Sequence, residues 1–494
     1  MFDALPSHPP LPPRRLIAAL LAALLLGACG DPLPNSPNGP KEPESVTIRK
    51  TPNQRGHLDR LHGELVLFTE GSAYEQGFQH GYLLRDEIRS YYREYFETKL
   101  MPAFKLVPSF TYYWAAKLLE RELTEEERAE IKGVAAGASL PEDQVLVMQA
   151  NPPWASPVTW FGDRPLPRPA FGSAAFVARG PATVARDTIL GYNVSGLDFG
   201  VRHRYALLRV HRPDKGYAFV TPGFVGQVLD AQGGWNEKGL AVSANAGLMR
   251  WENPSGVPTS TLTRRLVQHC RTVDEAEAMV RAVRRRAGQG MILTLATPRE
   301  ARVVEVAQTL SEAWQGRDHL VSRSVAPDGT LQAGNSYQSP ELQALTKDAA
   351  AAMRTDRMQA LLKASAGRLD VTRAMELLTD TVDRATGQQQ PSDRTISVAS
   401  APVFFKLGPW PVIDLGRVTT FLSSVRDLDQ GMLYLAQGHE RIESPAQFVG
   451  FDVKQLLTGT ASVPVVPVPS LPTATAGTLV SVPGYFAKTA FKAW

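Results

Sequence analysis

"PAFGSAAFVARGPATVARDTILGYN", residues 169–193, is the stretch on which the fold prediction depends. It begins in a proline-rich segment, continues as small and apolar residues from Ser173, turns at Gly180 and Pro181, and ends in a second apolar run. Short apolar runs separated by Gly and Pro predict two neighbouring strands. Ser173 stands where the loop meets the first strand, so it is either a reactive group or only the polar start of a buried strand.

Short apolar runs and longer amphipathic stretches recur through the rest of the chain. Strands are predicted at 174–179, 188–193, 206–212, 217–223, 239–246, 291–298, 301–307, 394–404 and 429–438. Helices are predicted at 260–286 and 342–383, and a further helix begins at Thr124 and ends at Gly137. Strand groups joined as hairpins and separated by helix pairs predict an α+β layered sandwich and argue against a doubly wound parallel sheet.

The composition limits the classes of partner. The chain has 494 residues, of which 43% are hydrophobic, so it can bury a large core as one large domain or two. Its 53 basic and 49 acidic residues leave a net charge of only +4. No global attraction to polyanions follows from this balance, and no nucleic acid is predicted as a partner.

The N-terminus predicts export. Arg14 and Arg15 precede an apolar run, residues 16–26, which is too short to span a bilayer and typical of a signal-peptide core. The run ends in "LGACGD", which resembles the bacterial lipoprotein signal. This resemblance implies a signal peptide at 1–28, lipidation of Cys29 and a lipid bilayer as partner, at the outer membrane of a Gram-negative cell. The alternative is an ordinary secretory signal with an incidental cysteine.

Cysteine and histidine usage gives no sign of a metal site or another cofactor. Cys29 and Cys270 are the only cysteines, so with Cys29 lipidated no disulfide is predicted inside the chain. Cys270 is expected to be a small buried apolar residue. The histidines are scattered, and only His203 and His211 lie near each other in the sequence.

Three common catalytic patterns are missing from the sequence: the Walker phosphate loop, the His-Glu-x-x-His zinc helix and the Gly-x-Ser-x-Gly elbow. Four other motifs follow one another instead: "GSAYEQGFQHG" (71–81), "GSAAFVARGPAT" (172–183), "GGWNEKGLAVSANA" (233–246) and "GNSYQSPEL" (334–342). In this order they resemble the motifs of the autoproteolytic acyltransferases and hydrolases related to isopenicillin N acyltransferase. That family belongs to the N-terminal nucleophile hydrolases and is distantly related to bile-salt hydrolases and phospholipase B-like proteins.

The resemblance covers about residues 63–452 and implies a four-layer αββα sandwich. It also implies that the precursor cuts itself between Gly172 and Ser173, where the family has glycine followed by cysteine. A glycine before the cut tolerates the strained backbone that self-cleavage requires. The free α-amine of Ser173, with a pKa of about 8, can accept the hydroxyl proton and so activate serine as the nucleophile.

The remaining site residues are carried by the same resemblance. Asn193 matches the asparagine of the family's Gly-Arg-Asn-x-Asp pattern, which holds the nucleophile's amine. Tyr192 replaces the arginine of that pattern, and Asp198 is displaced by an insertion. Asn245, at the end of "GLAVSAN", is the implied oxyanion donor, and Asn335 is a second polar group facing the nucleophile.

Several other positions differ from the family or stay open. Ser336 takes the place of the usual histidine, and Arg357 resembles a family arginine but is expected to be solvated on a helix. The aromatic residues of the segment 152–171 either form an apolar acyl site or only pack that loop.

The sequence therefore predicts a secreted lipoprotein with a tether at 29–62, an N-terminal segment at 63–172, a catalytic core at 173–455 and a surface tail at 456–494. Its predicted substrate is a small acylated amide, and no cofactor is predicted. The departures from the family pattern leave two alternatives open: an unprocessed, inactive lipoprotein that binds an acylated ligand, and a phospholipase B-like lipid deacylase.

Overall fold

A computed structural model describes most of the chain. The described residues are 45–103, 110–150, 173–230, 232–247, 256–283, 290–307, 320–343, 349–383, 385–389, 394–398, 404–405, 413–414 and 418–459. All of them belong to one unit, Ser45–Trp494. The predicted signal peptide, Cys29, the segment 152–172 with its aromatic residues and Gly172, and the tail from 460 lie outside the described residues.

The larger of the two main sheets has ten strands in the order β1-β2-β3-β6-β7-β8-β9-β10-β11-β12. Neighbouring strands are antiparallel except β3 and β6, which are parallel. The bounds are β1 (Ser45–Lys50), β2 (His57–Leu61), β3 (Glu64–Gly71), β6 (Ala206–Pro213), β7 (Phe219–Phe224), β8 (Gly234–Asn236), β9 (Ala241–Gly247), β10 (Gly290–Ala296), β11 (Ala301–Val306) and β12 (Leu320–Ser324).

The smaller sheet has six strands in the order β13-β4-β5-β16-β17-β18, all antiparallel. Its strands are β4 (Ala174–Arg179), β5 (Thr188–Leu197), β13 (Thr330–Ala333), β16 (Val418–Asp427), β17 (Met432–Ala436) and β18 (Val449–Asp452). A separate two-stranded ladder joins β14 (Phe404–Phe405) to β15 (Ile413–Asp414).

Alternation of side chains along the strands builds the layers. On β4, Ala175 and Val177 pack into the core between the two sheets, whereas Phe176 and Ala178 pack into a second core on the outer face. On β10, Ile292 likewise faces the core between the sheets, and its neighbours face outward. Successive residues of a strand point to opposite faces, so each sheet has one face toward the other sheet and one toward helices.

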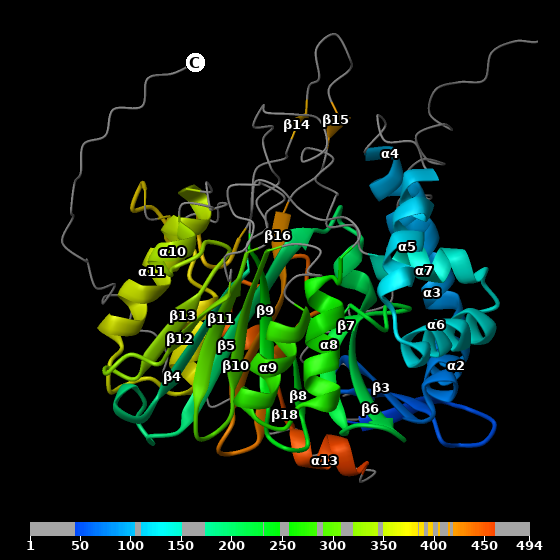
Figure 1. Cartoon of the computed structure of the whole chain (residues 1–494), viewed down its shortest axis with the longest axis horizontal. Helices are drawn as coiled ribbons and strands as arrows, with labels where there is room; N and C mark the ends of the chain where they lie inside the picture. Colours follow the sequence, from blue (N-terminus) through cyan, green and yellow to red (C-terminus); the bar gives the residue numbers. More distant parts are fainter. Residues whose placement is uncertain are drawn as a thin grey trace, which may run out of the picture. The chain divides into compact units, whose positions relative to one another are not determined.

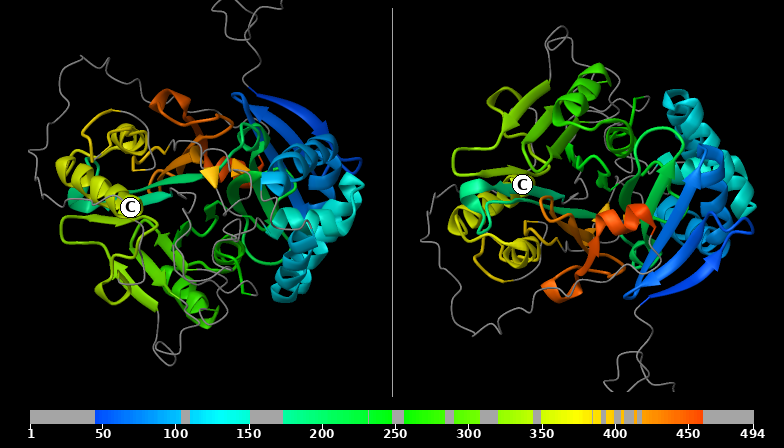
Figure 2. Two further views of the ribbon diagram at one scale, coloured as in Figure 1. Left: turned by 90° about the horizontal axis from the view of Figure 1, so that it is seen from above. Right: turned by 90° about the horizontal axis from the view of Figure 1, so that it is seen from below.

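Helices cover both outer faces, which completes the four layers (Figure 1). The outer face of the larger sheet packs on α8 (Thr259–His269) and α9 (Val273–Val283). The outer face of the smaller sheet packs on α11 (Ala349–Ala364) and α12 (Val371–Leu378). Figure 2 shows the two helix pairs on opposite sides of the stacked sheets. The predicted four-layer αββα sandwich is confirmed.

A group of N-terminal helices covers the β3 and β6 end of the larger sheet (Figure 1). The group consists of α2 (Ala73–Leu83), α3 (Arg85–Tyr91), η1 (Tyr92–Leu100), α4 (Met101–Ala103), α5 (Phe110–Glu122), α6 (Glu125–Ala138) and α7 (Glu142–Ala150). Helices α2 and α6 touch backbone to backbone through glycines. A Cβ at Gly77, Gly81, Gly133 or Gly137 would lie 2.0 to 2.4 Å from a carbonyl oxygen of the facing helix.

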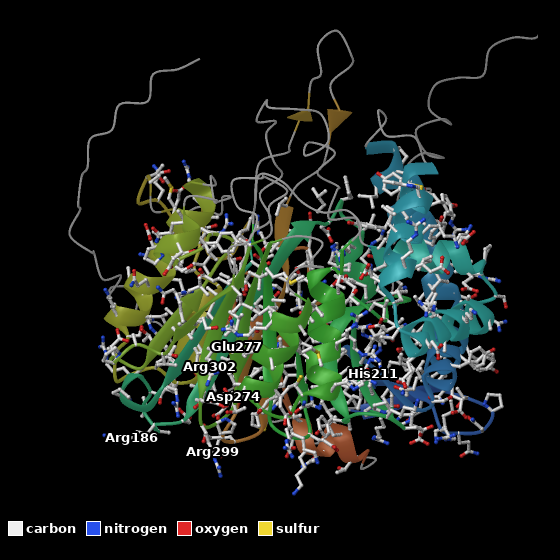
Figure 3. The ribbon with its side chains drawn as sticks, in the orientation of Figure 1. Arg186, His211, Asp274, Glu277, Arg299 and Arg302 are labelled. Carbon is white, nitrogen blue, oxygen red and sulfur yellow. The ribbon has the colours of Figure 1, made fainter. Side chains whose placement is uncertain are left out.

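Ion pairs fasten α9 to the larger sheet. Arg302 on β11 binds Asp274 at 2.6 Å and Glu277 at 3.0 Å (Figure 3). Arg281, one turn after Glu277, binds the same carboxylate at 2.7 Å. The acidic start of α9 thus faces the sheet and is neutralised there.

Several predicted boundaries are wrong. Residues 45–61, predicted as part of the tether, form β1 and β2, because each strand can pair with its neighbour in the larger sheet. The predicted helix at 260–286 is interrupted after His269, where Cys270 has extended backbone. The helical region predicted at 342–383 contains the end of α10 (Pro340–Gln343), α11 and α12, with Gly367 in a left-handed conformation between α11 and α12 and Asp370 capping α12.

Smaller differences concern helix and strand ends. The helix begins after Thr124 as predicted, but Ser139, rather than Gly137, adopts the left-handed conformation that ends it. Residues 394–398 form no strand. The predicted tail begins inside α13 (Val453–Thr458), and α10 (Pro340–Gln343) is a single short turn. In the described part of the chain, no helix has both the length and the apolar character needed to cross a membrane.

Candidate active site

Ser173 immediately precedes β4 and faces the space between the sheets. It lies two residues before Ala175, so the two side chains point to the same face of the sheet, and that of Ala175 packs in the core between the sheets. The Ser173 residue is 7% exposed, so its hydroxyl is nearly enclosed by protein.

Tyr192 connects Ser173 to the larger sheet. Tyr192 pairs with Ala175 in the β4–β5 ladder, and its hydroxyl interacts with the side chain of Ser173. The same hydroxyl donates a hydrogen bond to the backbone carbonyl of Ala244 on β9. Burial raises the pKa of the Tyr192 hydroxyl well above its usual value, so the group stays protonated at neutral pH.

Asn245 follows Ala244 and is the least satisfied polar side chain of the site. It pairs with Ile292 on β10 and shares the inner face of β9 with Ser243. Its side chain is fully buried, and neither Oδ1 nor Nδ2 has a hydrogen-bond partner in the described part of the chain. A buried amide without partners destabilises a fold by about 1–3 kcal/mol, and such a group is typical of a site that binds a ligand.

Asn335 meets the end of β9 from the other side. It lies two residues after Ala333, which pairs with Ala175, so the ladder register places it beside Ser173. Its Nδ2 donates to the carbonyl of Ala246 at 2.9 Å, and its Oδ1 accepts from Nη2 of Arg354 at 3.1 Å. The amide of Asn335 is therefore already engaged and holds the end of β9 in place.

Part of the chain matches a known protein family. Residues 188–401 match the model of the family described as acyl-coenzyme A:6-aminopenicillanic acid acyl-transferase. The predicted resemblance to this family is confirmed. The matched region begins on β5 and includes Asn193, Asn245 and Asn335, whereas Ser173 lies before it.

Individual relatives of the chain are distant. An uncharacterized protein from Archaeoglobus fulgidus is 26% identical over 440 residues, with 80% of this chain and 68% of that protein covered. Among solved structures, penicillin V acylase from Agrobacterium tumefaciens has 14% identity and a TM-score of 0.35 over 59% of this chain and 90% of its own. The Caenorhabditis elegans N-acylethanolamine-hydrolyzing acid amidase ortholog has 13% identity and a TM-score of 0.33 over 52% and 92%.

Asn193, which matches the acyl-transferase family pattern, faces away from Ser173. It pairs with Ala174, so its side chain is on the outer face of the smaller sheet. There its Nδ2 donates to the carbonyls of Leu378 at 2.7 Å and Ile396 at 3.2 Å, and its Oδ1 accepts from Ser423 at 2.6 Å. In this arrangement its amide fastens α12 to the sheet and does not touch the nucleophile.

Asp198 also binds elsewhere. It follows the end of β5, and its carboxylate accepts hydrogen bonds from the backbone N–H of His203 at 2.7 Å and pairs with Nδ1 of the same histidine at 2.8 Å. The structure thus brings together Ser173, Asn245 and Asn335 but leaves Asn193 and Asp198 outside that group.

The other positions singled out by the sequence are structural. Arg357 is not solvated as predicted, because it forms a half-buried ion pair with Asp380 at 2.7 Å. Ser336 is buried and lies 3.3 Å from the hydroxyl of Thr355. Cys270 is buried as predicted, and burial raises the pKa of its thiol to about 12. Within the described residues, no cluster of three His, Cys, Asp or Glu side chains can hold a metal ion.

Two buried arginines were missed by the sequence analysis. Arg354, one helical turn before Arg357, reaches Asn335. Arg426 lies on the inner face of β16, a strand that was also missed. Its signal is present in "VTTFLSSVRD" (418–427), where a charged residue follows a run of apolar and hydroxyl-bearing residues.

Proposed function

We propose that the chain is an autoproteolytic amide hydrolase or acyltransferase in which Ser173 is the N-terminal nucleophile. The family match supports chemistry on amides in general. The observation that carries the finer assignment is the position of Ser173: its hydroxyl faces inward and contacts Tyr192, beside a facing strand that carries the unpartnered amide of Asn245.

Self-cleavage is the first proposed step. Oγ of Ser173 attacks the carbonyl carbon of Gly172, a C–O bond forms, and the C–N bond to Ser173 breaks while the nitrogen takes up the hydroxyl proton. The product is an ester between the two residues and a free α-amine. Water then hydrolyses the ester to give the Gly172 carboxylate and the free Ser173 hydroxyl.

Turnover uses the same atoms. The free amine of Ser173 accepts the hydroxyl proton as Oγ attacks the substrate carbonyl, and the proton passes to the departing nitrogen. Nδ2 of Asn245 donates a hydrogen bond to the oxyanion, and Asn335 keeps that strand in position. The acyl group on Ser173 is then released to water or to an acceptor amine. The proposed substrate is a small acylated amide.

The test is intact mass spectrometry with N-terminal sequencing of the chain lacking residues 1–29, which keeps the unit Ser45–Trp494 whole. The expected result is a second chain that begins at Ser173 and is missing from a Ser173→Ala variant. If the Ser173→Ala variant is cut at the same place, Ser173 is not the nucleophile. A single uncut chain that is cut only after Ser173→Cys would contradict serine catalysis.

That last outcome would favour the second candidate function, an unprocessed lipoprotein that binds an acylated ligand. Its support is the combined loss of the family's cysteine, arginine and histidine at Ser173, Tyr192 and Ser336. The unpartnered amide of Asn245 fits a ligand carbonyl or carboxylate equally well.

We also propose that the protein is anchored in the bacterial cell envelope through lipidated Cys29. The support is the sequence "LGACGD" after an apolar run of signal-peptide length. Labelling of cells with a radioactive fatty acid is expected to mark the protein, and Cys29→Ala is expected to remove the label. Equal labelling of both forms would contradict this anchor.

A further inference from the structure

Arg426 is a fully buried cation between the two sheets. On β16 it lies opposite Leu190, two residues from the Ser424–Tyr192 pair, and its side chain crosses to the larger sheet. There Nη1 donates to the carbonyl of Val242 at 2.8 Å. Nη2 is close to Gly233, since a Cβ added to that glycine would lie 2.6 Å from it. The Arg426 residue is 1% exposed.

The charge of Arg426 is not balanced by a carboxylate. Two other buried arginines have one: Arg202 binds Asp230 at 3.2 Å, and Arg264 binds Glu130 at 3.0 Å. Arg209, which is also fully buried, donates to backbone carbonyls as Arg426 does. Among the described residues, the hydrogen bonds of Arg426 go to carbonyl and hydroxyl oxygens, and Tyr192 is the titratable group that interacts with its charge. Burying a cation without an anion is costly, so a retained one points to a function.

Arg426 lies next to the ring of Tyr192, the residue that interacts with Ser173. A Cβ on Gly233 would touch both the Arg426 guanidinium and, at 3.5 Å, the Tyr192 ring. The Tyr192 hydroxyl donates to the carbonyl of Ala244 and Arg426 donates to that of Val242. These two residues are two positions apart on β9, which is about 7 Å along the strand. Burial lowers the pKa of Arg426 to about 10, which leaves it charged at neutral pH.

We propose that Arg426 is a positioning residue of this site: it stabilises negative charge on the atom at position 173 through the Tyr192 hydroxyl. When position 173 becomes negatively charged, the Tyr192 hydroxyl donates its proton to that atom instead of to the Ala244 carbonyl. A cation next to Tyr192 favours this charged state. The inference rests on the proposed function of Ser173. It adds a source of positive potential next to Tyr192.

Other charges near Tyr192 do not take this role. Asp230 also faces Tyr192 and would oppose charge on Ser173, but Arg202 neutralises it. On the nucleophile's other side, Arg354 is engaged with Asn335.

The test replaces Ser173 by cysteine and titrates the thiol directly. The pKa of Cys in Ser173→Cys is read from the rate of iodoacetamide alkylation against pH, on chains lacking residues 1–29 and matched in processing state. The other thiol of this form, Cys270, gives little background because burial raises its pKa to about 12. Adding Arg426→Gln keeps hydrogen-bond donors toward Val242 while removing the charge.

The expected result is a rise in the pKa of the thiol by about 1 unit, which is a tenfold loss of alkylation rate at a pH below that pKa. Arg357→Gln is the matched control, because the charge of Arg357 is already balanced by Asp380. It is expected to leave the pKa of the thiol unchanged. An unchanged pKa in Arg426→Gln, or an equal rise in Arg357→Gln, overturns the proposal.

If Arg426→Gln does not fold, the same titration of Ser173→Cys is made with Tyr192→Phe, which removes only the hydroxyl through which Arg426 is proposed to act. A rise in the pKa of the thiol supports the proposal, and no rise overturns it. The titration needs no turnover, so its failure is separate from failure of the proposed function. If the protein cleaves itself but Arg426→Gln leaves the pKa of the thiol unchanged, the proposed function of Ser173 stands and the role of Arg426 is overturned. If the pKa rises in a chain that never cleaves itself, the role of Arg426 stands and the proposed function of Ser173 is overturned.

Discussion

Replacing Asn245 by alanine is expected to separate activity from stability. Asn245 is buried without a hydrogen-bond partner in the described part of the chain, whereas Asn193, also fully buried, uses its amide fully. The two residues lie on the strands β9 and β5. They therefore form a matched pair in which the same substitution, asparagine to alanine, removes an unpaired amide in one case and a paired amide in the other.

The magnitudes follow from the contacts. Asn245→Ala removes no hydrogen bond to the described residues and relieves the desolvation of a buried amide, about 1–3 kcal/mol, which offsets the packing lost with the side chain. We expect its free energy of unfolding to stay within about 1 kcal/mol of the parent or to rise. Asn193→Ala breaks three hydrogen bonds, to Leu378, Ile396 and Ser423, and we expect a loss of about 3 kcal/mol.

The effects on reaction rate are expected to be opposite. Asn245→Ala removes the proposed oxyanion donor, so the rate at which the chain beginning at Ser173 appears should fall by about 10²–10³-fold. Asn193→Ala leaves that donor in place. Its effect on rate should be small at a temperature where the variant is folded.

The assay measures both quantities on chains without residues 1–29. Urea unfolding is followed by tryptophan fluorescence in a Ser173→Ala background, so that every variant is uncut, and cleavage is followed by mass spectrometry in the Ser173 background. If Asn245→Ala loses as much stability as Asn193→Ala, its amide is hydrogen bonded in the folded protein, and the reasoning from an unpaired donor is refuted. A normal cleavage rate would refute its role in the reaction.

Three further outcomes are expected. Gly137→Ala should lower the free energy of unfolding by about 1–3 kcal/mol, because its methyl group would lie 2.4 Å from the carbonyl oxygen of Phe78; a urea midpoint equal to the parent's would contradict the helix contact. Ser72→Ala should lower it by about 1 kcal/mol through loss of the α2 capping box, by the same assay. Burial lowers the pKa of His80 to about 3, and its Nε2 accepts from the N–H of Gly226 at 2.9 Å. In the unfolded chain this histidine binds a proton below about pH 6.5, whereas in the folded protein it stays neutral until about pH 3. His80 therefore lowers the free energy of unfolding as pH falls from about 6.5 toward 3, by up to about 1.4 kcal/mol per pH unit. His80→Gln should flatten that slope in urea unfolding at several pH values; an unchanged slope would mean that His80 is protonated in the fold.

The strands could be predicted where their pattern is local. The runs at 174–179, 206–212 and 301–307 are short, apolar and bounded by turn residues, and each is a strand. Residues 45–50 carry no such signal, because β1 is an exposed edge strand whose stability comes from pairing with β2. The pairing of β3 with β6 joins residues far apart in sequence and cannot be read from either segment.

The site was predicted in part for the same reason. Ser173, which the motif order singled out, precedes β4, Asn245 lies within β9 and Asn335 follows β13. Their catalytic roles stay predictions. The motif order could not show that Asn193 faces outward, since that depends on the register of β5 against β4. Nor could it find Arg426, whose role arises only when β16 is laid beside β5.

The two polar groups at this site bear on whether the site has decayed. A pocket without function can accept substitutions that stabilise the fold. Replacing an unpaired buried amide or an unbalanced buried cation would be such a substitution, because both groups lower stability. Among the described residues, Asn245 is such an amide and Arg426 is such a cation. Tyr192 stands where the pattern of the acyl-transferase family has arginine, and Arg426 on the neighbouring strand β16 lies next to the ring of Tyr192. The amide of Asn245 and the buried cation of Arg426 therefore support the proposal that Ser173 is the nucleophile.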